Sequence, residues 1–180
     1  LLGAVAGYGG AATDAVISRA VDVMLSLPTF FLLIVIQSLF PPSTMNVALI
    51  IGATSWMALA RIVRGQFLSL KRREFVEAAR ALGAGPVRIV FRHLLPSATS
   101  QIIVFFTLGL ADAVLVESAL SFLGLGVPAY QASWGNMLSD GQISILSGSW
   151  WVALFPGLMI LLTALSINFV GDGLQESLFS

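Results

Sequence analysis

Two carboxylates, Asp112 and Glu117, stand inside the otherwise apolar stretch of residues 99–125. A charged side chain at the centre of a membrane costs about 2.5 to 3.5 kcal/mol on insertion scales, so such residues normally face a protein interior or water. Five positions along a helix correspond to a rotation of about 140°, which places the two carboxylates on different faces. They are therefore not a paired acid–base dyad.

The rest of the sequence offers little catalytic chemistry. His93 is the only histidine and cysteine is absent, so no zinc site and no Ser-His-Asp arrangement can be assembled. No Gly-x-x-x-x-Gly-Lys-Ser/Thr phosphate loop occurs either. The formal net charge is zero, which gives no electrostatic footprint for nucleic acid. We expect a chain that is not an enzyme, holds no metal or cofactor and binds no nucleic acid.

The elements that carry these residues are expected to be membrane spans. Only 10% of the 180 residues are charged, 57% are hydrophobic and the mean hydropathy is +0.94. An average globular chain has about 25% charged residues, so a soluble enzyme is excluded. Apolar segments that approach the roughly 20 residues needed for a crossing occur at 24–40, 46–60 (continuing to Arg64), 99–125 and 150–170. Residues 1–8 look like the end of an earlier span, so we expect an all-α membrane protein with four complete crossings and part of a fifth.

The basic residues predict the orientation of these spans. Eight of the nine lie between Arg61 and Arg92, and the ninth is Arg19. Short loops rich in Lys and Arg stay in the cytoplasm. This rule places the loop of residues 65–97 inside, and the alternation of spans then puts Arg19 on the same side.

The 65–97 loop is longer than the roughly 2 to 8 residues that connect helices in a bundle, so it should have its own structure. Helical spacing places Phe75, Ala78, Ala79 and Leu82 on one face, and Gly83 and Gly85 should end that helix. A second helix is expected from Pro86, with Val87, Val90, Phe91 and Leu94 on one face, and Pro96 should close the unit. Such helices either lie on anionic lipid headgroups or present a small-residue face to another protein. Ala78 and Ala79 favour the second role.

The string Glu77-Ala78-Ala79, followed by Gly83 and by Leu95-Pro96, resembles the EAA loop of ABC-importer permeases. Other segments resemble the C-type permease subunit of dipeptide and oligopeptide importers, and together they cover essentially the whole chain. They are GYGG at 7–10, RAVD at 19–22, ARIVRGQ at 60–66, SALSFLGLG at 118–126, SWG at 133–135 with Met-Leu at 137–138, FPG at 155–157 and NFVGDGL at 168–174.

The resemblance implies one transmembrane permease domain over residues 1–180, a polytopic helical bundle with about five of six spans present and the first preceding Leu1. It also implies that the 65–97 loop forms coupling helices that sit in a cleft of a separate ATPase. There Glu77 would orient the first helix by pairing with Arg80 or with a residue of the ATPase. Ala78 and Ala79 would permit close docking, Gly83 a sharp turn, and Pro96 the end of the unit.

The implied partners are ATPase chains that bind ATP and Mg, a second homologous permease, an extracellular solute-binding protein, membrane lipid and a peptide substrate. The implied location is the cytoplasmic (inner) membrane of a bacterium or archaeon. Nickel or glutathione import is the alternative within this architecture. An ion-coupled secondary transporter is the alternative from another class, although a gradient-driven carrier does not need a coupling loop.

For a transporter, the two carboxylates in the third long apolar segment become candidates for the translocation path. Asp112 lies deeper, where it could meet the ammonium end of a peptide. Glu117 lies nearer the outside and could instead fix the approach to the turn at residues 121–126. Structural hydrogen bonds within the bundle are the competing role for both residues.

Overall fold

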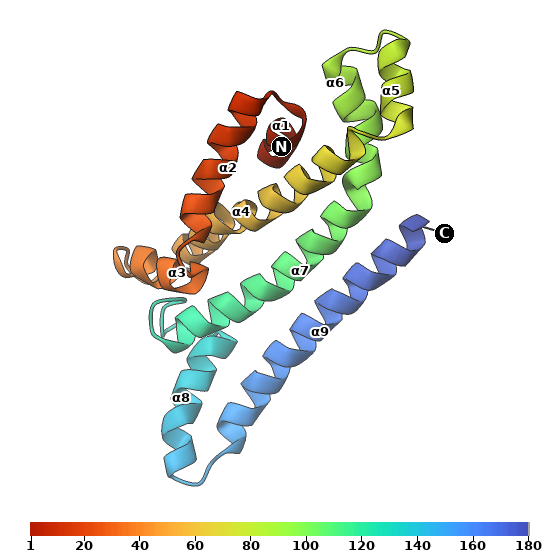
Figure 1. Cartoon of the computed structure of the whole chain (residues 1–180). Helices are drawn as coiled ribbons and strands as arrows, with labels where there is room; N and C mark the ends of the chain where they lie inside the picture. The colour runs from red at the N-terminus through yellow and green to blue at the C-terminus, as the bar shows by residue number, and fades with distance from the viewer. Residues whose placement is uncertain (180) are drawn as a thin grey trace. The chain divides into compact units, whose positions relative to one another are not determined.

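The computed structural model describes residues 1–179, except for the side chains of Leu146, Leu178 and Phe179, and this part of the chain is helical without strands. The helices are α1 (Leu2–Tyr8), α2 (Ala11–Leu25), α3 (Thr29–Ser38), α4 (Thr44–Leu70), α5 (Glu74–Ala81), α6 (Pro86–Ile89), the π-helical turn η1 (Val90–Leu94), α7 (Leu95–Phe122), α8 (Trp134–Leu146) and α9 (Trp151–Phe179). Figure 1 shows them along the chain. The all-α prediction is confirmed.

Three helical stretches of the described residues are long and apolar enough to cross a membrane: Thr44–Leu70, Pro86–Phe122 and Trp151–Ser177. They contain the predicted spans at 46–64, 99–125 and 150–170, apart from a few terminal residues. A fourth crossing is present only if α2 and α3 count together as one broken span.

The predicted span at residues 24–40 is wrong as a single helix. The chain leaves the helical conformation between Ser26 and Pro28, and α3 that follows has only 10 residues. Proline disfavours a helical conformation in the residue before it and has no N–H to donate, so Pro28 starts a new helix instead of kinking an old one. The helix before the break extends back to Ala11, so Arg19 lies within a helix.

The prediction that Pro96 closes the loop is also wrong, because the helix continues through it. In the turn η1 the N–H of Leu95 donates to the carbonyl of Val90, five residues earlier, and α7 begins at once. Proline is tolerated in the first turn of a helix, where its missing N–H breaks no ladder. A π-type turn marks the junction, so α6, η1 and α7 form one helical run from Pro86 to Phe122.

The chain divides into two compact units, and both α4 and α7 contribute to each of them. Unit 1 comprises residues 1–27, 56–106 and the C-terminal end from Leu174. Its apolar core joins α1, α4, α5, α6, η1 and the start of α7. The buried members of this core are Ala4, Val63, Phe67, Val76, Ala79, Ile89, Leu94 and Ala98. The helices of the 65–97 loop are therefore packed on unit 1 through this core.

Unit 2 comprises residues 28–55 and 107–173. Here α8 and α9 form an antiparallel hairpin, which Figure 1 shows in blue. A side chain at Gly141 of α8 would lie 2.9 Å from Cβ of Ala153 in α9, so the glycine permits close packing. The Ser133 side chain caps α8 by accepting a hydrogen bond from the N–H of Asn136 at 3.1 Å.

Candidate coupling site

The helix α5 and the turn after it have the shape that the sequence predicts. Glu74 and Glu77 lie in its first turn and Arg80 in its last, an arrangement that complements the helix dipole. After Leu82 the chain turns at Gly83, whose φ of 81° is a left-handed conformation that glycine adopts without steric cost. The turn is closed by the N–H of Ala84, which donates to the carbonyl of Ala79 at 3.0 Å. The predicted end of this helix is confirmed.

The predicted apolar face of α5 is mostly exposed, as expected for a face that meets lipid or another protein. Of its four residues only Ala79 is buried, and the second inward residue is Val76, which is fully buried. Phe75, Ala78 and Leu82 are exposed, with Leu82 at 88%. We call these three residues the outer face of α5. Ala79 consequently packs α5 onto unit 1, which corrects its expected place beside Ala78 on a docking surface.

The second helical piece behaves in the same way. Ile89 and Leu94 are buried, whereas Val87 and Phe91 are exposed. The exposed pair lines an apolar groove of about 260 Å³ between the α6–η1 stretch and α1. Apolar spacing thus located both helices, and within the two predicted faces only Ala79 and Leu94 are buried.

Glu77 makes no ion pair or hydrogen bond through its side chain within the described part of the chain, and it is exposed. The expected partner Arg80 instead lies over the ring of Tyr8, with its guanidinium carbon 5.8 Å from the ring centroid. Pairing between Glu77 and Arg80 is therefore absent. The carboxylate of Glu77 is free to meet a group from another chain.

His93 lies next to α5, with its ring 6.4 Å from that of Phe75. The described residues contain no group of three or more His, Cys, Asp or Glu side chains that could hold a metal ion.

The two carboxylates of α7 differ in their surroundings. Asp112 is exposed, and no hydrogen bond or ion pair is found for its side chain within residues 1–179. Glu117 accepts a hydrogen bond from the hydroxyl of Ser121 at 2.7 Å, and the same hydroxyl accepts one from the backbone N–H of Val127 at 2.9 Å. Glu117 therefore orients a serine that ties α7 to the turn after it.

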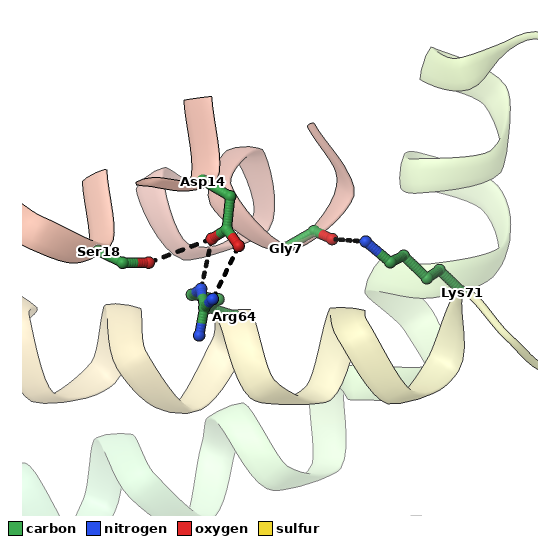
Figure 2. Close-up of polar contacts among 5 residues, drawn as sticks. All are labelled: Gly7, Asp14, Ser18, Arg64 and Lys71. Atoms are coloured by element: carbon green, nitrogen blue, oxygen red, sulfur yellow. Dashed lines mark hydrogen bonds and ion pairs between the residues drawn. The ribbon is translucent and has the colours of Figure 1, made fainter. Parts of the chain in front are cut away.

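A set of contacts that the sequence did not predict joins α1 and α2 to α4 (Figure 2). Arg64 forms a bidentate ion pair with Asp14, whose carboxylate also accepts a hydrogen bond from Ser18 at 3.1 Å. The ammonium of Lys71 donates to the carbonyl of Gly7 at 2.9 Å. A signal was present: Asp14, Ser18 and Asp22 recur every four residues on one helix face.

Apolar helices of spanning length, together with short helices that pack on unit 1, define a polytopic helical membrane protein. Residues 1–179 match the family described as "Binding-protein-dependent transport system inner membrane component", and the chain belongs to that family.

Similar proteins carry related names. A putative peptide permease protein of Brucella ovis is 42% identical over 98% of this chain and 59% of its own length. The dipeptide transport system permease protein DppC of Bacillus subtilis is 43% identical over 99% of this chain and 56% of its own length. The oligopeptide transport system permease protein OppC of Haemophilus influenzae is 40% identical over 99% of this chain and 57% of its own length. The chain therefore spans a little under three fifths of the length of these relatives.

Proposed function

We propose that this chain is part of the permease subunit of an ATP-driven ABC importer that moves dipeptides or oligopeptides across the inner membrane. The observation that carries the proposal is the similarity over nearly the whole chain to proteins named as dipeptide and oligopeptide permeases. The family name supports a partnership with an external binding protein. ATP is hydrolysed by separate chains, and a second permease subunit completes the path.

The ATPase docks on the 65–97 loop, which lies in the cytoplasm. The outer face of α5 supports this role because it exposes apolar side chains beside the sharp turn at Gly83. Burial of Val76 and Ala79 fixes α5 to unit 1, so a push on this helix moves the ends of α4 and α7 with it. Glu77 adds a carboxylate without a partner for a basic group of the ATPase. Pro96 lies inside the continuous run from α6 to α7 and keeps its place in the coupling unit as a helix residue, not as a stop.

The solute path runs beside Asp112. An exposed carboxylate in the middle of a long apolar helix cannot face lipid cheaply, so water, solute or a partner chain must meet it. In this position it contacts the ammonium group of a peptide. Glu117 is held by Ser121 and acts on the path through the shape of the following turn.

The test is uptake into proteoliposomes that contain the full-length permease, its partner permease, the ATPase chains and the binding protein. Labelled dipeptide should accumulate only with ATP, and dissipating ion gradients should leave uptake unchanged. Uptake that needs a gradient but no ATP would establish an ion-coupled carrier instead. Nickel or glutathione in place of the peptide identifies the solute, and transport of either one without peptide transport refutes the peptide assignment.

One substitution tests the docking surface. Ala78→Arg places a long charged side chain on the outer face of α5 and should abolish co-purification of the ATPase. The matched control is Ala12→Arg, at an exposed alanine of α2 outside the loop, which should retain the ATPase. Equal retention by both variants would remove the docking assignment.

A further inference from the structure

Helix α1 lies against α4 with almost no space between the two backbones. A side chain at Gly3 would collide with the carbonyl of Ala60, and one at Gly7 would lie 2.6 Å from Cβ of Phe67. Gly3 and Gly7 are four residues apart and so share one helix face, a spacing that lets helices approach closely in membranes. The first segment of the chain is thus seated on α4.

Helix α2 is held to the same helix by charge. The Asp14–Arg64 pair is bidentate and partly shielded, with 22% and 32% of the two side chains exposed. A second pair, Asp22–Arg61, has an N–O distance of 2.7 Å, but more than half of each side chain is exposed. Exposed pairs contribute little, so the Asp14–Arg64 pair is the one that fixes α2.

The end of α1 also contacts α5, the helix on which we propose that the ATPase docks. Tyr8, at the end of α1, receives the guanidinium of Arg80 from α5 on its ring. The carbonyl of Gly7, one residue earlier, accepts a hydrogen bond from Lys71, the residue directly after α4. Tyr8 packs in addition against the core that contains Val76 and Ala79 of α5. The α1–α2 hairpin (residues 2–25) therefore contacts α5 through a cation–π interaction and through apolar packing.

We propose that the α1–α2 hairpin moves as one body with α5, and that Tyr8 and Asp14 are the positioning residues that make it do so. Tyr8 links the hairpin to the docking helix, and Asp14 links it to α4. When the ATPase displaces α5, the hairpin then moves with α5, and the two elements do not slide past each other. The inference rests on the proposed function, since it assigns these residues to the coupling of ATP hydrolysis to transport.

The test compares the amount of solute moved per ATP hydrolysed in the complete transporter. Tyr8→Leu removes the aromatic face and should lower this ratio by about two- to fivefold, the size expected for an exposed cation–π contact. Tyr8→Phe keeps the face and should retain the ratio of the parent. Tyr8 is changed rather than Arg80 because an exposed arginine on α5 could touch the ATPase directly.

Asp14→Asn should lower the ratio further, and Asp22→Asn, in the exposed pair, is its matched control with the ratio of the parent. A purely structural role would reduce the number of assembled complexes and leave the ratio unchanged. Unchanged ratios in Tyr8→Leu and Asp14→Asn therefore overturn the inference. A parent transporter without ATP-dependent uptake would refute the proposed function instead.

A spectroscopic measurement tests the same idea without transport. Residues 1–180 contain no cysteine, so Val16→Cys in α2 and Ala81→Cys in α5, both at exposed positions, place two spin labels on this part of the chain. Any cysteines elsewhere in the complex are replaced by serine. The distance between the labels should stay single and narrow with and without ATP. A distance that changes with nucleotide in the parent overturns the inference, and broadening in Tyr8→Leu supports it. This arm remains decisive even if Asp14→Asn fails to assemble.

Discussion

The contact between α1 and α4 predicts a large effect from a single methyl group at Gly7. In Gly7→Ala the new carbon would lie 2.6 Å from Cβ of Phe67 and 2.8 Å from the carbonyl oxygen of Arg64. Ordinary contact begins near 3.4 Å, so α1 must move by the difference, 0.6 to 0.8 Å. Neither opposing atom is the end of a flexible side chain, so the whole helix has to shift. Overpacking of this kind costs about 1 to 3 kcal/mol.

A gain in helix propensity opposes this cost. Alanine is favoured over glycine in a helix by about 0.8 to 1.0 kcal/mol, which leaves a net destabilisation of about 0 to 2 kcal/mol. The displacement also lengthens the 2.9 Å hydrogen bond from Lys71 to the carbonyl of residue 7. Solute uptake should therefore fall together with stability.

The assay is reversible unfolding of the full-length permease in mixed detergent micelles, with Gly52→Ala as control. Gly52 also lies inside a helix, but a side chain there would meet no atom within 4 Å. Only the propensity term acts at that site, so the control should be as stable as the parent or up to about 1 kcal/mol more stable. If Gly7→Ala is at least as stable as Gly52→Ala, the close contact between α1 and α4 is wrong.

Three further substitutions test local geometry. Gly83→Ala should lower the free energy of unfolding by about 1 to 2 kcal/mol because its φ of 81° is strained for an L-residue, and Gly85→Ala, at ordinary φ, should not. Ser121→Ala leaves a buried backbone N–H without its acceptor and should cost about 1 to 3 kcal/mol in the same assay, whereas Ser118→Ala, which loses only a 3.4 Å contact, should cost less. Ser133→Ala removes the cap of α8 and should cost about 1 kcal/mol, and a stability equal to that of the parent would contradict the capping geometry.

The long apolar segments were readable from the sequence because a membrane span needs only length and the absence of charge. The two errors in the helix boundaries both concern proline. Pro28 separates two helices, whereas Pro96 lies within a continuous one. The difference depends on the turn before the proline. The π-type turn η1 lets the helix continue through Pro96 although this residue has no backbone N–H. A single sequence does not reveal that turn.

The helices of the 65–97 loop were predicted at the right place, and the face of α5 that was expected to meet lipid or another protein is exposed except at Ala79. Hydrophobic spacing shows which residues share a face, but it does not say whether that face packs within the chain or onto a partner. In α5 the core of unit 1 takes Val76 and Ala79, and Phe75, Ala78 and Leu82 remain outside. The larger, outward set lies on the face that was expected to meet lipid or another protein, whereas the buried residue Val76 lies outside that face.

The contacts of the α1–α2 hairpin explain why the sequence could indicate the polar face of α2 but not the partner of each charge on it. Asp14 and Arg64 are 50 residues apart, and each also stands near other charged residues with which it could have paired. The two residues can pair only when Gly3 and Gly7 bring α1 against α4. That contact fixes the position along α4 at which α2 packs. The close packing at these glycines thus determines which charged residues form ion pairs. The same close approach brings Tyr8 within reach of Arg80, so packing of the smallest residues places the hairpin beside the helix on which an ATPase would push.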